Sequence, residues 1–223
     1  MTTDNRRYDY LIVGAGLTGS VLARELSDAG APCLVIEKRD HIGGNVYDEV
    51  IEGVTVHRYG PHLFHTNSER VWNYVNRFSD WTPYEYRVKA IYQGVAYSFP
   101  PNLMTYQQLG ISPDDPSLNG ILFETFFRGY SAKQWGRSAD EVPASIIKRI
   151  PLRYDYDDRY FSDRYQGLPV GGYTSLVSQI LQGVSVELGV NYLTHRPEFD
   201  RLAYCTIYTG PIDSLYNVKL GRR

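Results

Sequence analysis

The feature that most constrains the fold is a strand–loop–helix–strand pattern near the N-terminus. Residues 9–13 form a short apolar, β-rich run, which predicts a buried strand. The run leads into Gly14-Ala15-Gly16-Leu17-Thr18-Gly19, which has the spacing G-x-G-x-x-G. Residues 17–29 have helical periodicity, and residues 33–36 form a second apolar strand that ends at Glu37. The pattern predicts a complete βαβ unit of the dinucleotide-binding type, with its acid about 20 residues after the loop.

Each residue of this loop has a physical role in binding a pyrophosphate. Gly14 permits the tight turn, Gly16 lets the backbone approach the phosphates, and Gly19 lets the helix pack closely on the strand. The helix N-terminus offers N–H groups and a partial positive charge. Glu37 can accept hydrogen bonds from ribose hydroxyls. The alternative, a chance glycine-rich turn, explains neither the two strands nor the acid.

A second glycine pair, Gly43-Gly44, follows the acid and favours FAD over NAD. The run from Glu37 to Asn45 has the pattern E-K-R-x-x-x-G-G, which resembles the two-glycine segment of FAD-dependent oxidoreductases of the amine-oxidase and mutase superfamily. Such a pair allows a second close approach of the backbone, near the phosphates and sugar of the cofactor. The alternative is a turn that enters a β-hairpin of residues 46–50 and 54–58.

Composition excludes several classes of protein. The chain has 223 residues, 43% of them hydrophobic and 22% charged, with a formal net charge of −2. The hydrophobic and charged fractions exclude disordered, collagen-like and coiled-coil chains. The chain has no overall positive charge that would favour nucleic acid as a partner. No apolar run is long enough for a membrane span and no signal peptide is recognised, so we expect a cytoplasmic protein. Cys33 and Cys205 lie in apolar runs and are predicted to be buried free thiols.

The remaining patterns predict an α/β chain that leaves a Rossmann-like sheet and returns to it. We expect an FAD-binding βαβ unit and hairpin in residues 1–66 and an inserted helical and hairpin substrate lobe in residues 67–165. Residues 166–223 return to the FAD-binding domain, with a strand at 204–208 that rejoins the first strand. Thr66 and Glu69 have the spacing of a capping box, which predicts a helix start there.

Several long strings resemble one enzyme family. Together with the N-terminal unit, they resemble bacterial UDP-galactopyranose mutase, in order and over nearly the whole chain. They are Tyr59-Gly60-Pro61-His62-Leu63-Phe64-His65-Thr66, Gly129-Tyr130-Ser131-Ala132-Lys133-Gln134-Trp135-Gly136, Ile147-Lys148-Arg149-Ile150-Pro151-Leu152-Arg153, Tyr160-Phe161-Ser162-Asp163-Arg164-Tyr165-Gln166-Gly167-Leu168-Pro169 and Tyr208-Thr209-Gly210-Pro211-Ile212-Asp213.

The resemblance implies an isomerase that interconverts UDP-galactopyranose and UDP-galactofuranose. The family uses reduced FAD, whose N5 attacks the anomeric carbon, and the product serves cell-wall or surface polysaccharides. The cofactor contacts carried over from the family are Gly14, Gly16, Thr18, Gly19, Glu37, Lys38, Gly44, Asn45, His62 and Leu63. His62 and Arg153 are the catalytic candidates, with His62 against the flavin. A core histidine bonded to backbone is the alternative for His62.

The substrate candidates lie in the middle of the chain. The resemblance places Trp135 and Ser131 near the uridine diphosphate, and their i, i+4 spacing predicts one helix face. Tyr160 is expected to bind a phosphate oxygen. Arg149 and Arg153 would supply positive charge, whereas a solvated basic stretch is the alternative. No metal site is predicted.

Family members continue well beyond the last of these strings, so we expect a fold that is incomplete at its C-terminus. Two alternatives to the mutase therefore stay open. One is a truncated, inactive remnant that binds FAD or a nucleotide, and the other is a different FAD-dependent oxidoreductase. Family members are often dimers, so the resemblance allows a homodimer, but the sequence does not determine the oligomeric state.

Overall fold

The computed structural model describes residues 6–136, 138, 141 and 152–216, and the chain divides into two compact units. The first unit comprises Met1–Pro83 and Gly167–Arg223, and the second comprises Tyr84–Gln166. The sequence placed the start of the inserted lobe at residue 67, whereas this division places it at residue 84.

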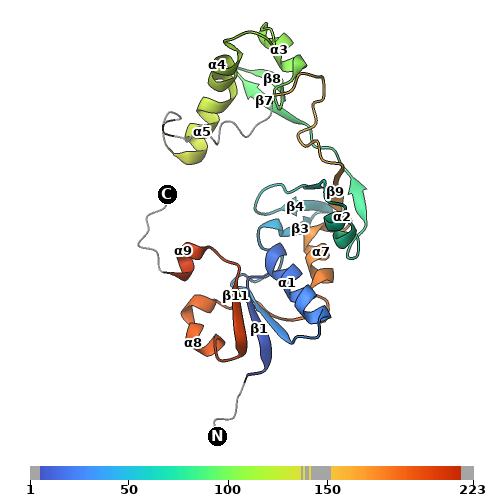
Figure 1. Ribbon diagram of the computed structural model, residues 1–223, viewed down its shortest axis with the longest axis vertical. Helices are drawn as coiled ribbons and strands as arrows, with labels where there is room; N and C mark the ends of the chain where they lie inside the picture. Colours follow the sequence, from blue (N-terminus) through green and yellow to red (C-terminus); the bar gives the residue numbers. More distant parts are fainter. Residues whose placement is uncertain (1–5, 137, 139–140, 142–151, 217–223) are drawn as a thin grey trace. The chain divides into compact units, whose positions relative to one another are not determined.

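The first unit is built on a parallel four-stranded sheet with the order β10-β2-β1-β11. Figure 1 shows two of its neighbouring strands, β1 and β11, side by side. The helix α1 (Leu17–Asp28) connects the two central strands, as the sequence predicted. The Rossmann-like fold is thereby confirmed, including the return of the chain to pair with its first strand. The strands are β1 (Tyr8–Val13), β2 (Cys33–Ile36), β10 (Ser185–Glu187) and β11 (Ala203–Tyr208).

Alternating residues of the two central strands point to opposite faces of this sheet. On one face, Ile12 and Val35 pack with α1 and with α7 (Gly172–Ile180). On the other face, Leu11 and Leu34 pack with the segment that carries η4 (Tyr192–Thr194) and α8 (Arg196–Phe199). Both faces are therefore covered, which explains why these strands are continuously apolar.

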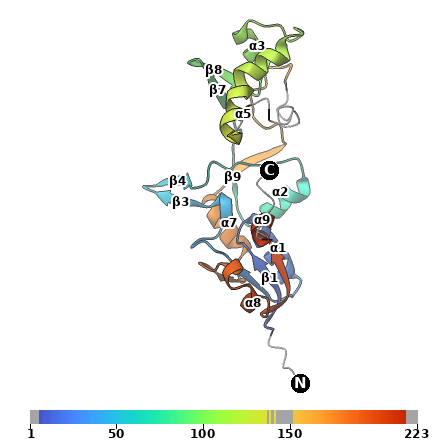
Figure 2. The ribbon, with the colours of Figure 1, turned by 90° about the vertical axis from the view of Figure 1, so that its left-hand side faces the viewer.

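A hairpin follows the sheet, formed by β3 (Asp48–Ile51) and β4 (Val54–His57). Its turn residues Glu52 and Gly53 have positive φ values of 50° and 80°. This geometry suits a two-residue hairpin turn, so the hairpin alternative for this region is also correct. Figure 2 shows the hairpin projecting beside α7.

A small three-stranded sheet completes the first unit, with the order β5-β9-β6. The helix α2 begins after Ser68, whose hydroxyl accepts a hydrogen bond from the Val71 amide, so Ser68 and not Thr66 is the N-cap. The rings of Phe64, Trp72 and Trp81 pack together, which holds α2 and β6 in this unit and moves the boundary past residue 66. The elements are β5 (Phe64–Thr66), α2 (Glu69–Val75), β6 (Trp81–Pro83) and β9 (Tyr165–Pro169).

The second unit combines a hairpin with helices. Its buried core contains Tyr106, Leu118, Leu122 and Phe127. Asn102 caps α3 through hydrogen bonds from the amides of the first turn. The elements are β7 (Val88–Tyr92), β8 (Val95–Phe99), α3 (Leu103–Leu109), α4 (Leu118–Leu122), the π-helical η2 (Phe123–Phe127) and α5 (Arg128–Trp135).

The two cysteines differ in their exposure. Cys33 is buried as predicted, but Cys205 is exposed, because β11 lies at the edge of the sheet. Among the described residues, no helix combines the length and the hydropathy that a membrane crossing needs.

Candidate functional site

The glycine loop between β1 and α1 is packed so tightly that side chains are excluded. Gly14 has a φ of 112°, and a Cβ atom there would lie 2.4 Å from Oγ1 of Thr209. A Cβ atom at Gly19 would lie 1.9 Å from the carbonyl oxygen of Gly14. The first and third glycines of the motif are therefore required by the local geometry, for the reasons predicted.

The loop presents the N-terminus of α1. Its N-cap residue is Gly16, which has extended backbone geometry and no side chain that could cap the helix. The first N–H groups of a helix lack partners within it and carry partial positive charge. Thr18, in this first turn, is exposed. The arrangement offers backbone donors to an anionic group such as a diphosphate.

Glu37 lies beside this loop, at the C-terminal end of β2, and is only 7% exposed. Its carboxylate accepts hydrogen bonds from the amide of Ala15 at 2.9 Å and from the amide of Arg39 at 3.0 Å. A carboxylate has about four acceptor positions, so these two bonds leave capacity for hydroxyl donors. Glu37 thus has the position and chemistry expected of the ribose-binding acid.

The second glycine turn lies directly on the first. Gly43 donates its amide to the carbonyl oxygen of Ala15 at 2.8 Å and forms a parallel bridge with Gly16. A Cβ atom at Gly44 would lie 2.9 Å from the Cα atom of Gly16. Gly43 and Gly44 have φ values of 91° and 57°. The pair therefore provides a close approach of two backbones, and the predicted role is compatible with this geometry.

Side chains of residues 38–47 contact one another around the second glycine turn. Lys38 and Asn45 are exposed, and the guanidinium of Arg39 donates to Oδ1 of Asn45 at 3.1 Å. The ring of Tyr47 stacks on that of His41. Burial, followed by the charge of Glu49, raises the pKa of the Tyr47 phenol, so this ring stays neutral near pH 7.

His62 and Leu63 are partly buried in the first unit, just before β5. The Nδ1 atom of His62 lies 2.8 Å from the carbonyl oxygen of Gly60, and its amide donates to Nδ1 of His57 at 3.4 Å. A carbonyl oxygen can only accept, so in the neutral ring the proton is assigned to Nδ1 and Nε2 is the acceptor. The hydrogen bond to backbone that the alternative for His62 predicts is therefore present. Because it uses only Nδ1, it is compatible with a role of His62 beside a cofactor.

These residues fit a dinucleotide cofactor by shape and by donor set. The glycine loop excludes side chains, the helix N-terminus supplies donors and the buried carboxylate of Glu37 supplies acceptors. All ten cofactor candidates belong to the first unit. They come from the β1–α1 loop, the end of β2, the second glycine turn and the segment before β5.

Arg153 belongs to the second unit and is engaged with its own loop. Its guanidinium donates to the carbonyl oxygens of Asp157 at 3.0 Å, of Tyr160 at 3.4 Å and of Arg159. The side chain is 11% exposed. Arg153 therefore organises residues 153–160, and these three bonds use much of its hydrogen-bonding capacity.

The other substrate candidates of the second unit differ in accessibility. Ser131 is buried, whereas Trp135, one turn later on α5, is 44% exposed. The ring of Tyr160 makes edge contacts with the rings of Tyr86 and Phe161, with centroid distances of 5.8 Å and 4.9 Å. Arg149 lies outside the described residues.

Asp48 is a buried charged residue that the sequence analysis missed. Its carboxylate accepts hydrogen bonds from the amides of Tyr173 at 2.6 Å and Thr174 at 2.9 Å, in the first turn of α7. Only the Gly171-Gly172 pair at the start of this helix could have signalled the contact. No cluster of three His, Cys, Asp or Glu side chains suited to a metal occurs among residues 6–136, 138, 141 and 152–216.

Comparisons with known proteins agree with this geometry. Residues 12–78 match the family model of the NAD(P)-binding Rossmann-like domain, and residues 125–223 match that of UDP-galactopyranose mutase. A probable UDP-galactopyranose mutase of Klebsiella pneumoniae is 41% identical over 95% of this chain and 62% of its own length. A dTDP-fucopyranose mutase of Escherichia coli is 38% identical over 95% of this chain and 65% of its own length.

A solved structure supports the fold. The crystal structure of a reduced UDP-galactopyranose mutase matches 81% of this chain and 48% of its own, with a TM-score of 0.61 and 16% identity. The chain thus spans less than two thirds of the length of the curated relatives described above. The resemblance predicted from the sequence is confirmed.

Proposed function

We propose that this chain, a relative of the UDP-galactopyranose mutases, is an FAD-dependent isomerase that interconverts UDP-galactopyranose and UDP-galactofuranose. The observation that carries the proposal is the contact between the two glycine turns beside the buried Glu37. It occurs in a chain that is 41% identical to a probable mutase over 95% of its length.

The first unit would hold the cofactor. The N-terminus of α1 would bind its diphosphate, Glu37 would accept hydrogen bonds from a ribose, and His62 and Leu63 would contact the flavin. When bound, reduced FAD supplies a nucleophilic N5 for attack on the anomeric carbon of the sugar. Nδ1 of His62 is engaged with the Gly60 carbonyl oxygen, so Nε2 is the ring atom that His62 would present to the cofactor.

The second unit would supply the nucleotide contacts. Trp135 offers an exposed indole for stacking, and Tyr160 offers a hydroxyl for a phosphate oxygen. Arg153 keeps the Tyr160 loop in place, and Arg149 would add positive charge. The substrate class is a nucleoside diphosphate linked to a hexose. Because one relative is a dTDP-fucopyranose mutase, the dTDP sugar is the competing substrate.

The first experiment measures flavin binding. The purified protein is mixed with FAD and desalted, and the visible absorbance of the retained flavin is recorded. We expect retention by the wild type and a loss of roughly tenfold or more in affinity for Glu37→Ala, since a charged acceptor is removed. Glu187→Ala is the matched control, because that side chain is exposed on the neighbouring strand. Retention of no flavin by the wild type would refute the proposal.

The second experiment measures turnover. UDP-galactofuranose and the corresponding dTDP-fucofuranose are incubated with the dithionite-reduced protein, and the products are separated by chromatography. Conversion of the UDP sugar supports the proposal, whereas preference for the dTDP sugar corrects the substrate. Flavin binding without turnover of either sugar favours the inactive remnant.

A further inference from the structure

His41 and Tyr59 connect two segments of the first unit that both carry candidate cofactor residues. His41 lies between Glu37 and the Gly43-Gly44 turn, and Tyr59 lies just before the segment of His62. The Nε2 atom of His41 is 2.8 Å from the hydroxyl oxygen of Tyr59.

The direction of this hydrogen bond follows from the other ring nitrogen. Nδ1 of His41 lies 2.8 Å from the carbonyl oxygen of Ile42, which can only accept. The proton of the neutral ring is therefore on Nδ1, and Nε2 accepts from the Tyr59 hydroxyl. One imidazole thus bonds the backbone next to Gly43 and the side chain of Tyr59.

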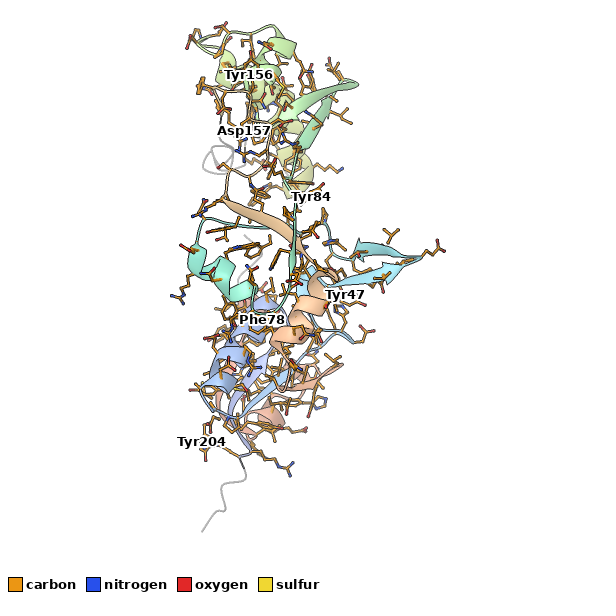
Figure 3. The ribbon with its side chains drawn as sticks, turned by 90° about the vertical axis from the view of Figure 1, so that its right-hand side faces the viewer. Tyr47, Phe78, Tyr84, Tyr156, Asp157 and Tyr204 are labelled. Carbon is orange, nitrogen blue, oxygen red and sulfur yellow. The ribbon has the colours of Figure 1, made fainter. Side chains whose placement is uncertain are left out.

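Both rings are held by further contacts. The ring of His41 stacks on Tyr47, with centroids 3.7 Å apart and an interplanar angle of 18°. The guanidinium carbon of Arg39 lies 4.3 Å from the centroid of the Tyr59 ring, and this guanidinium also donates to Asn45. Tyr47 is labelled in Figure 3, where it lies at the base of the hairpin. The hydrogen bond therefore belongs to a group of five contacting side chains.

We propose that His41 and Tyr59 are positioning residues of the cofactor site. Their hydrogen bond keeps the second glycine turn and the His62 segment in place before the cofactor binds. The proposal rests on the proposed function, because it assumes that these two segments contact FAD.

The backbone explains why such a connection is needed. Gly43, Gly44 and Gly60 have φ values of 91°, 57° and 97°, so both segments contain glycines in the left-handed region. Glycine has more conformational freedom to lose than any other residue. Ordering a flexible segment when the cofactor binds costs conformational entropy, which lowers the affinity. A segment that is already ordered before binding avoids this cost.

A double-mutant cycle on FAD binding tests the proposal. Tyr59→Phe removes the hydroxyl but keeps the ring under Arg39, and His41→Phe keeps the stacking on Tyr47 but removes both nitrogens. His41→Gln restores an acceptor and serves as the rescue variant. Tyr92→Phe is the matched control, because it removes a tyrosine hydroxyl that accepts a hydrogen bond from Gln93 at 3.3 Å in the second unit. Circular dichroism in the far ultraviolet checks folding, and the visible circular dichroism of bound flavin reports its environment.

We expect Tyr59→Phe to weaken FAD binding roughly two- to tenfold, which corresponds to the net contribution of one hydrogen bond. His41→Phe should weaken it at least as much, because it also removes the bond between Nδ1 and the Ile42 carbonyl oxygen. The double variant should be no weaker than the weaker single variant, His41→Gln should recover most of the affinity, and Tyr92→Phe should match the wild type. Single variants that bind FAD as tightly as the wild type, or effects that simply add, would overturn the positioning role alone. A wild type that does not bind FAD would overturn the proposed function, and this inference with it.

Discussion

The carboxylate of Asp48 is expected to be a major source of stability for the first unit. It is 4% exposed and accepts two hydrogen bonds from the first turn of α7, although the two segments are about 125 residues apart in the chain. The backbone of Asp48 also bonds the Thr174 hydroxyl in both directions, at 2.9 and 2.7 Å. A Cβ atom at Gly172 would lie 2.7 Å from the carboxylate, so the fit is close.

The magnitude follows from these contacts. Loss of an N-cap acceptor costs about 0.5–2 kcal/mol, and a hydrogen bond to a charged group contributes about 1.5–3 kcal/mol. Asp48→Ala removes both bonds and leaves two amides at a buried helix end, so we expect a loss of about 2–4 kcal/mol. Asp48→Asn keeps one acceptor but turns an NH2 group toward the second amide, so we expect a loss of about 1–2 kcal/mol.

Urea denaturation followed by far-ultraviolet circular dichroism gives the free energy of unfolding, and hydrogen exchange of residues 172–180 gives the local effect. Glu49→Ala is the control, because its ion pair with Arg58 at 3.2 Å is at the surface and contributes at most about 1 kcal/mol. The reasoning is refuted if Asp48→Ala costs no more than Glu49→Ala, or if exchange in α7 is unchanged.

Further predictions concern both units. Gly19→Ala should destabilise the protein by at least about 2 kcal/mol in urea denaturation and abolish FAD retention, because its Cβ would overlap the Gly14 carbonyl; the same change at the open Gly30 should be milder. Hydrogen bonds from Arg159 lower the pKa of Asp157 to about 2, so the ionised carboxylate stabilises the fold above pH 3.8 and this contribution is lost as the pH falls through 2. Asp157→Asn should therefore reduce the difference in unfolding free energy between pH 5 and pH 2.5, and an unchanged difference would contradict the assignment. Arg153→Lys should lower the melting temperature, because one ammonium group cannot reproduce the guanidinium contacts with three carbonyl oxygens; an unaltered melting curve would argue against this role.

The N-terminal half of the site could be predicted from sequence because its pattern is local. The spacing of Gly14, Gly16 and Gly19, followed by Glu37, predicts a geometry that only a βαβ unit produces, and the structure contains it. The pairing of β11 with β1 was also predicted, because residues 204–208 read as a strand that returns to the sheet late in the chain.

The contacts that were missed depend on tertiary structure. Nothing near Asp48 indicates that it will cap a helix far along the chain. Thr66 and Ser68 are both good N-cap residues, and the choice between them depends on the packing of α2. The basic run around Arg153 predicts phosphate binding, but it gives no sign that the guanidinium also bonds carbonyl oxygens of its own loop. Cys205 lies in an apolar run, but the edge position of β11 exposes it.

The order in which the two units can form during synthesis follows from how the chain divides. The second unit is one continuous stretch, Tyr84–Gln166, whereas the first needs both Met1–Pro83 and Gly167–Arg223. A ribosome therefore releases all of the inserted unit before it releases β11 and α7. Until then β1 has an unpaired edge and α1 lacks its neighbouring helix, and unpaired strand edges and uncovered apolar surface are the features that make a partly formed domain prone to aggregate.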